Sequence, residues 1–181
     1  MPEFESVTLQ LRGMYHDVLR NAHGQTVWDS GWRHNTIVTD CRRLLSGFMH
    51  GTPTGSLGIQ GLQVGAGLAA WDLPPGLPIP NPSQTALADP HPFTVPRVNL
   101  QFTYLSSGVV SATPTNTVQI IATLGPNVPT WPDPDHSTST LREFGLVGQL
   151  DGSPVLINYV THPAIPKDPF STLERTVWLV F

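Results

Sequence analysis

Residues 141–148 read Leu141-Arg142-Glu143-Phe144-Gly145-Leu146-Val147-Gly148, an apolar run that carries one charged pair. Neighbouring residues of a strand point to opposite faces, so Arg142 and Glu143 cannot pair with each other. We expect this run to be the strand that fixes sheet pairing, with at least one charge beside the core or at a subunit seam. A charge in that position needs a partner. For Glu143 the candidates are an arginine such as Arg97 or Arg175, or backbone N–H groups; the alternative is an exposed edge position.

The residues after this run continue the strand pattern to the end of the chain. Asp151-Gly152 is a favoured two-residue hairpin turn, so Val155 to Val160 should return beside 141–150. A loop is expected over 161–171, because it contains three prolines. In the last run the residues that share one face are Leu173, Arg175, Val177, Leu179 and Phe181.

The residues before it add more strands. The segment 1–34 predicts an N-terminal hairpin, with strands over 6–20 and 25–33 around an Asn-Ala-His-Gly turn. Further strands are expected over 59–68, 97–105 and 116–124. The 97–105 run has the clearest alternation, with a predicted face of Val98, Leu100, Phe102 and Tyr104.

One segment, 35–51, changes to a helical period. Its apolar residues Ile37, Cys41, Leu44, Leu45 and Phe48 fall on one stripe. We expect Asn35 or Thr36 to cap the start of the helix and Gly51 to end it in the left-handed conformation.

Proline dominates residues 72–96, which hold eight of them. This density excludes a helix or a central strand and favours an extended loop or arm. Such a segment could pack against a neighbouring subunit, run over the surface or take part in peptide-like recognition. A second proline-rich loop is expected over 125–139. Taken together, residues 1–181 predict a single mainly-β domain: an antiparallel β-sandwich, jelly-roll-like, with one α-helix and long Pro-rich loops.

Composition limits the function classes. Only 12% of residues are charged, about half the usual share, which fits an assembled protein or a plain secreted β domain. A net charge of −4 without a basic stripe argues against nucleic acid. No apolar run reaches the roughly 18 residues of a membrane span, so no membrane insertion is expected. The first five residues lack the features of a secretion signal, so we expect export inside a particle or by lysis.

No catalytic, cofactor or metal signature is found, and we predict a non-enzymatic protein without a cofactor. Gly65-x-Gly67 lacks the third glycine and the following helix of a dinucleotide site, and is interpreted as a backbone turn. The cluster Asp133-Pro134-Asp135-His136 could present oxygens to a hard cation, but it lacks the remaining ligands of a calcium loop, and a solvated loop is the alternative. Trp71 and Trp131 could stack on a sugar; packing in a core or interface is the alternative.

An ordered series of short motifs resembles phage tail and virion structural proteins, a pattern that also occurs in phage-derived contractile injection particles. The series covers residues 33–181 and consists of Asn35-x-Ile37-Val38, Leu62-Gln63-Val64-Gly65-x-Gly67, a strand from about Arg97, Leu141 to Leu146 with its hairpin, and the segment Pro163 to Lys167. It departs from the pattern at Val147, where an aromatic residue is usual, and in the length of 72–96.

The resemblance implies a structural component of a tail, baseplate, fibre or capsid-decorating layer, made in the bacterial cytoplasm and located in the virion or an extracellular phage-like particle. Its partners would be copies of itself and other particle proteins. The alternative is a carbohydrate- or receptor-binding module at a tail tip, which would contact a host-surface glycan or receptor. The residues implied in assembly or structure are Arg142, Glu143, Gly145, Gly65, Gly67 and Lys167.

Overall fold

The computed structural model describes residues 11–51 and 55–181, which form one α-helix, two short 3-10 helices and twelve antiparallel strands. The strands are β1 (Arg12–Arg20), β2 (Thr26–Asp29), β3 (Arg33–Ile37), β4 (Leu57–Gly65), β5 (Phe93–Pro96), β6 (Leu100–Ser106), β7 (Val109–Ser111), β8 (Thr117–Leu124), β9 (Thr140–Leu150), β10 (Ser153–Leu156), β11 (Asn158–Pro166) and β12 (Thr172–Val180). The helices are α1 (Thr39–His50), η1 (Ala69–Asp72) and η2 (Arg97–Asn99).

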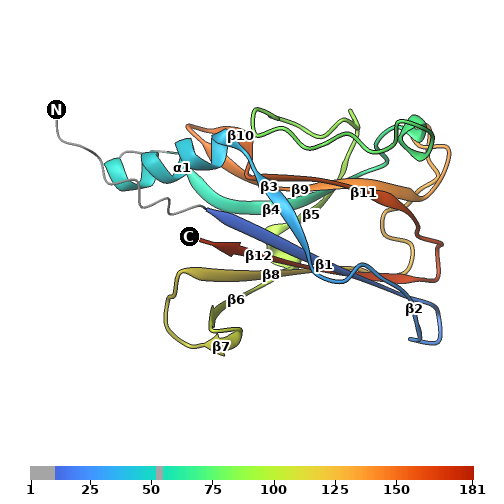
Figure 1. Ribbon diagram of the computed structural model, residues 1–181, viewed down its shortest axis with the longest axis horizontal. Coiled ribbons are helices and arrows are strands. Elements are labelled where there is room, and N and C mark those ends of the chain that lie inside the picture. Colours follow the sequence, from blue (N-terminus) through green and yellow to red (C-terminus); the bar gives the residue numbers. More distant parts are fainter. Residues whose placement is uncertain (1–10, 52–54) are drawn as a thin grey trace.

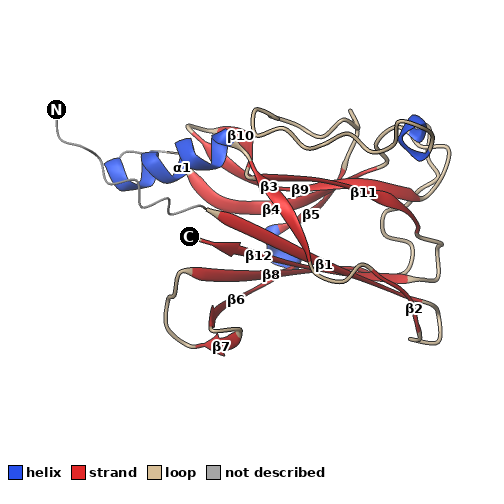
Figure 2. Cartoon of the chain, viewed as in Figure 1, coloured by secondary structure: helices blue, strands red, loops and turns tan. Residues whose placement is uncertain are grey.

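The strands form one folded sheet with two layers. Its order is β5-β4-β9-β11-β3-β1-β12-β8-β6-β7, with β10 beside β9 and β2 beside β1. Figure 1 shows β4, β9 and β11 in one layer and β1, β12, β8 and β6 in the other. The predicted mainly-β, antiparallel sandwich with one α-helix is therefore confirmed, and Figure 2 shows long loops connecting the strands at both ends.

Strand β3 joins the two layers. Its first residues pair with β1, with Asn35 opposite Gly13, and its last residues pair with β11, with Ile37 opposite Asn158. Figure 1 shows β3 crossing diagonally between the layers. This pairing explains why the helix begins later than the sequence predicts. Asn35 and Thr36 are strand residues rather than caps, and the N-cap position is Val38, which makes no side-chain capping bond. The predicted end is confirmed, since Gly51 has φ of 76°.

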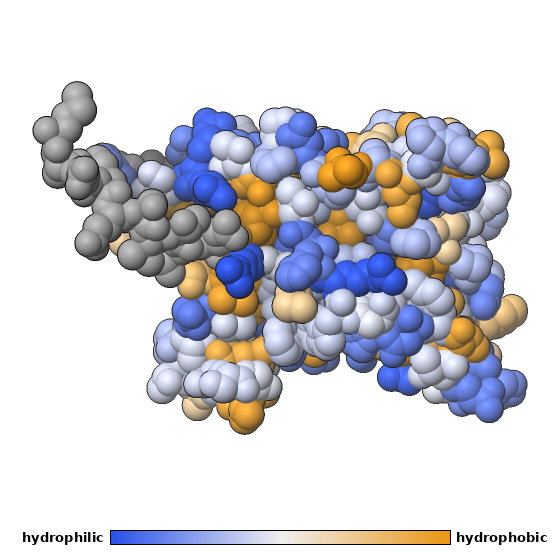
Figure 3. Space-filling model, in the orientation of Figure 1, coloured by the Kyte–Doolittle hydropathy of each residue, from blue (hydrophilic) through white to orange (hydrophobic). Residues whose placement is uncertain are grey.

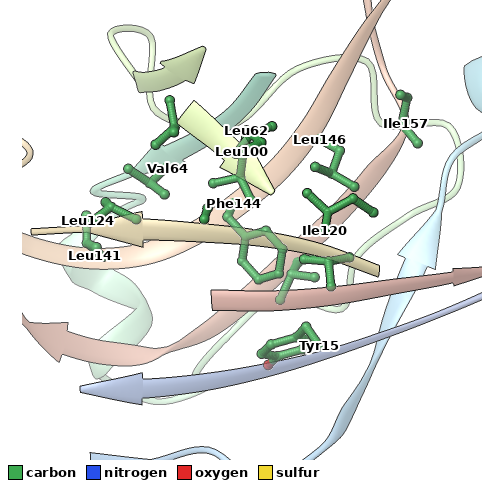
Figure 4. Packing of buried hydrophobic residues seen from close by; sticks show 14 of the residues in the cluster. Tyr15, Leu62, Val64, Leu100, Ile120, Leu124, Leu141, Phe144, Leu146 and Ile157 are labelled. Carbon is green, nitrogen blue, oxygen red and sulfur yellow. The ribbon is translucent and has the colours of Figure 1, made fainter. Parts of the chain in front are cut away.

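The core lies between the layers and is built from alternating residues of facing strands. The ring of Phe144 on β9 packs edge-on against Tyr15 on β1, with 5.2 Å between ring centroids. Figure 4 shows Phe144 near the middle of this cluster, with Ile120 and Leu146 close by. On β12 the residues predicted to share one face do so and are buried from Leu173 to Leu179, while Phe181 beyond the strand is 39% exposed.

The β9–β10 hairpin forms as predicted, with Asp151 and Gly152 both at positive φ. A smaller apolar cluster covers the outer face of this layer. Leu87, from the proline-rich segment, packs there with Val38, Leu156 and Tyr159. The proline-rich segment is thus held on the sheet by its own buried leucine, and its last residues form the edge strand β5 against β4. Edge strands tolerate proline because one side needs no ladder bonds.

Three other predictions need correction or limitation. The run 97–105 begins as η2, with Val98 88% exposed, because the chain crosses there from β5 in one layer to β6 in the other. The predicted loop 161–171 is strand as far as Pro166, since an irregularity in the β9–β11 ladder accommodates Pro163. In the N-terminal hairpin, β1 pairs with both β2 and β3, and the part of the prediction that falls on residues 1–10 lies outside the described residues.

Candidate functional site

The carboxylate of Glu143 lies at the centre of a hydrogen-bond network on the outer face of β9. It is fully buried and accepts bonds from the backbone N–H groups of Ala88 at 2.9 Å and Asp89 at 2.7 Å. The hydroxyl of Tyr159 on β11 donates a third bond, at 2.5 Å, and both burial and this carboxylate raise the pKa of Tyr159. Of the partners predicted for Glu143, the backbone N–H groups are confirmed and the arginines are wrong.

Asp89 extends the network to the second proline-rich loop. Its Oδ2 accepts the N–H of Ala66 at 2.8 Å and lies 3.0 Å from Nε2 of His136. The other ring nitrogen of His136, Nδ1, lies 2.8 Å from Oδ1 of Asp133. The indole of Trp131 is stacked on the imidazole, with 3.8 Å between ring centroids. Both nitrogens and one ring face of His136 are therefore engaged, and Trp131 is buried.

Arg142 fixes a third segment, the short helix η1. Its Nε and Nη2 donate to the carboxylate of Asp72, the latter at 2.6 Å, and its Nη1 donates to the carbonyl of Ala66 at 3.0 Å. Hydrogen bonds from this guanidinium hold the pKa of Asp72 below its ordinary value. Such two-point contacts orient both groups as well as attracting them. Arg142 thus joins β9 to the residues that follow β4.

Three glycines leave the space that these contacts need. A Cβ atom at Gly65 would lie 2.6 Å from Oε1 of Glu143, and one at Gly145 would lie 2.6 Å from the carbonyl oxygen of Asn158. Gly67 combines a φ of +57° with close contact to the ring of Trp71. At the Gly65-x-Gly67 turn the backbone is therefore in close contact with the Glu143 carboxylate and with the indole ring of Trp71.

Lys167 plays a similar part for another loop. Its side chain is buried, and Nζ donates to the carbonyls of Gly125 at 2.8 Å and Ser171 at 3.0 Å. Burial lowers the pKa of Lys167. This ammonium group joins the start of the 125–139 loop to the turn before β12. Arg142, Glu143 and Lys167 thus make contacts that attach loops to the sheet, and Gly65 and Gly67 leave room for such contacts.

The polar groups of this network have their partners within the protein. Its carboxylates, imidazole and guanidinium bind one another or the backbone. Residues 11–51 and 55–181 contain no group of three His, Cys, Asp or Glu side chains able to hold a metal ion. A hollow of about 260 Å³ beside the network is lined by Gly67, Asp135, His136, Ser137 and Arg142, among others. Asp133 is one of the candidate cation ligands. Its Oδ1 instead accepts hydrogen bonds from the backbone N–H groups of Asp135 and His136.

Trp71 lies beside a larger hollow at the same end of the molecule. This hollow has a volume of about 490 Å³, and its lining includes Asp72, Gly76 and Leu77 of the proline-rich segment together with Pro163 and Ala164 of β11. The two tryptophans proposed for ligand stacking therefore differ: Trp131 is covered by its own protein, whereas Trp71 faces an open hollow.

Several members of the network could not be identified from the sequence. Asp72 and Asp89 lie in a proline-rich segment, 70 and 54 residues from their partners on β9. Tyr159 lies between Asn158 and Val160, and the sequence does not distinguish it from a core tyrosine. The one usable signal was the placement of an acidic residue within an apolar strand, which identified Glu143 itself.

Comparisons of the chain with protein-family models, curated proteins and solved structures gave no match. In the described part of the chain, no helix combines the length and the apolar character needed to cross a membrane.

Proposed function

We propose that this chain is a non-enzymatic structural component of a phage or phage-tail-like particle, acting through self-association and contacts with other particle proteins. The observation that carries the proposal is an apolar surface at one end of the sandwich. We call this the helix end; it comprises the C-terminal half of α1, the start of β4, the β6–β7 hairpin and Phe181. The opposite end, where 66–77 and 125–139 meet the sheet, is called the loop end.

Two hollows at the helix end share a lining residue, Ile59. One, of about 210 Å³, lies between α1 and the sheet and is lined by Cys41, Leu44, Phe48, Ile59 and Phe181, among others. Ile59 also lines a neighbouring hollow with Phe102, Tyr104 and Val118. Ile59 on β4 thus lies between a hollow beside α1 and a hollow beside β6 and β8.

Several exposed apolar side chains belong to the elements of the helix end. Met49 is 89% exposed, Val109 and Val110 of the edge strand β7 are 70% and 65% exposed, and Leu57 and Phe181 are also exposed. Figure 3 shows an orange surface at the β7 tip. Single exposed apolar residues are ordinary, but several on the elements of one end, together with hollows lined largely by apolar residues, are typical of an interaction surface. The low charge content of the chain supports the same proposal.

The loop end supports a complementary role. There the buried polar side chains attach two long loops to the sheet, so the surface that they form has a fixed shape. The apolar helix end suits docking against another protein. The rigid loop end then remains free to present its loops. Binding between preformed surfaces avoids the entropy cost of ordering loops.

Sedimentation velocity of the full chain tests self-association. We expect a concentration-dependent oligomer, which Met49→Glu combined with Val110→Glu shifts to the monomer because charges then enter the interface. Ile79→Glu is the matched control: Ile79 is 93% exposed but belongs to the proline-rich segment. A wild-type chain that stays monomeric at all concentrations contradicts self-association through this surface.

Particle membership needs a separate measurement. Particles released by cells that carry the gene are purified on a density gradient and analysed by mass spectrometry. We expect the chain to sediment with the particles in a fixed ratio to their other proteins. Its absence from every particle fraction contradicts the proposed function.

A further inference from the structure

The hollow at the loop end has the size and lining of a small-molecule site. Its volume of about 490 Å³ lies within the range of ligand pockets, about 300–1,000 Å³. It is bounded on one side by Trp71 and Asp72 and on the other by Pro163 and Ala164. One aromatic ring, one carboxylate and several small apolar residues therefore face the same space.

The ring of Trp71 is held in a fixed position. Its backbone N–H donates to the carbonyl of Leu68 at 3.0 Å, and its six-membered ring lies so close to Gly67 that no Cβ could fit there. In the part of the chain that the structure describes, the indole N–H has no hydrogen-bond partner, whereas that of Trp178 donates to Gln119 at 2.9 Å. Trp71 thus offers a flat apolar surface and an unused donor.

Asp72 supplies acceptors beside this ring. Its side chain is 41% exposed, and the contact with Arg142 holds it in one orientation and in its ionised form. Each carboxylate oxygen can accept more than one hydrogen bond. Because Arg142 balances its charge, the site has little attraction for a cation, but it can still accept bonds from neutral hydroxyl groups.

Hydrogen bonds hold the proline-rich wall of the hollow in place. On the wall formed by the proline-rich segment, the N–H of Gly76 donates to the carbonyl of Leu73 at 2.7 Å. The hydroxyl of Thr161 on β11 donates to the carbonyl of Pro78 at 2.8 Å, which joins that segment to the opposite wall. The site is therefore formed before any ligand arrives, and binding requires little ordering.

We propose that this hollow binds a saccharide, with the C–H face of a pyranose ring on the indole of Trp71 and its hydroxyl groups donating to the carboxylate of Asp72. A purely apolar ligand would bury Asp72 without satisfying its remaining acceptors, which is costly. A neutral, polyhydroxylated ring with one apolar face matches both walls. The proposal does not depend on the particle role, because a sugar could bind to a single copy of the chain.

Saturation-transfer NMR on the full chain tests this directly. The probes are the methyl pyranosides of glucose, galactose, mannose and N-acetylglucosamine, followed by a glycan array for longer saccharides. We expect at least one pyranoside to receive saturation, most strongly at the C–H protons of one ring face. Trp71→Ala should weaken its binding at least 10-fold, and Trp71→Phe should retain part of it, since a smaller aromatic ring remains.

The matched control is Trp32→Ala. Trp32 is 43% exposed and packs on Trp178 at 4.3 Å between ring centroids, away from the lining of this hollow. This variant should bind the sugar as the wild type does, and circular dichroism establishes that all variants are folded. The proposal is overturned if no pyranoside or array glycan binds the wild type, or if binding persists unchanged in folded Trp71→Ala.

Discussion

The guanidinium of Arg175 and the carboxylate of Asp17 form a two-point ion pair within the core of the sandwich. The contacts are 2.7 Å from Nε to Oδ1 and 2.6 Å from Nη2 to Oδ2, and both side chains are fully buried. The two residues are directly opposite on β12 and β1. The guanidinium also lies 3.8 Å from the ring centroid of Phe144 on β9, so one charged group contacts both layers.

Breaking this pair from either side should be strongly destabilising. Arg175→Met leaves the Asp17 carboxylate buried without its partner, and we expect a loss of about 3–5 kcal/mol in the free energy of unfolding. Asp17→Leu should cost a similar amount. The double variant should be much less destabilised than the sum of the two, because no unpaired charge remains. Urea denaturation of the wild type, the two single variants and the double variant gives the coupling free energy between the two side chains.

An exposed pair provides the control for this cycle. Arg43 and Asp40 are three residues apart on α1 and lie 2.9 Å apart at the surface of the helix. Arg43→Met should change the unfolding midpoint little, as is usual for exposed ion pairs. If the losses in the free energy of unfolding at Asp17 and Arg175 are additive, the two side chains are not coupled.

His162 should make the stability of the protein depend on pH. Burial, and then the neighbouring Arg175, lower its pKa from 6.5 to about 4, while Asp17 opposes this shift. The distances agree with a neutral ring: Nδ1 donates to the carbonyl of Pro163 at 2.9 Å and Nε2 accepts from Nη2 of Arg175 at 3.1 Å. A protonated ring would direct an N–H at another donor.

The direction of this pH dependence follows from the number of protons bound in the folded and unfolded states. Between pH 6.5 and about 4 the unfolded chain carries the extra proton, so stability should fall with decreasing pH, by about 3 kcal/mol in total. In His162→Gln this decline should disappear, because glutamine does not titrate. Carboxylates such as Asp72 have pKa values below 3.8, and their contributions are lost only at lower pH. Parallel pH profiles of the two proteins, measured by urea denaturation, would contradict the assignment.

The sequence was sufficient for features that depend on neighbouring residues. The β9–β10 hairpin follows from the backbone freedom of Asp151-Gly152, and the inward face of β12 follows from strict alternation. Arg175 lies on the same face as Leu173 and Val177, as the alternation predicts. These elements need no knowledge of the partner strand, since period and turn chemistry are properties of the segment itself.

Features that depend on distant pairing could not be predicted. Asn35 carries the chemistry of a helix cap, but pairing with Gly13 makes it part of a strand. Val98 continues an alternating pattern, but the crossing between layers places it in solvent. The contact of Glu143 with Asp89 joins residues 54 apart. Local patterns show that Glu143 needs a partner without showing which loop supplies it.

Glu143→Gln tests how strongly the first proline-rich segment depends on this contact. The amide has one acceptor oxygen, so at least one of the N–H groups of Ala88 and Asp89 loses its bond. We expect a destabilisation of about 2–4 kcal/mol in urea unfolding and faster amide exchange at these two positions. Glu174→Gln, on the half-buried face of β12, is the control and should change stability by less than about 0.5 kcal/mol. Unchanged exchange at Ala88 and Asp89 would show that the segment is held by other contacts.

Gly145→Ala tests the close approach of β9 and β11. The added Cβ would lie 2.6 Å from the carbonyl oxygen of Asn158, a backbone atom that cannot move without disturbing the ladder. We expect a loss of about 1–3 kcal/mol, as for other overpacked interiors, and a lower thermal midpoint. Gly58→Ala supplies the matched control, because a Cβ there has no atom within 4 Å and its backbone needs no positive φ. Since both changes remove the same backbone freedom from the unfolded chain, the difference between the two thermal midpoints isolates the steric contact, and equal midpoints would contradict it.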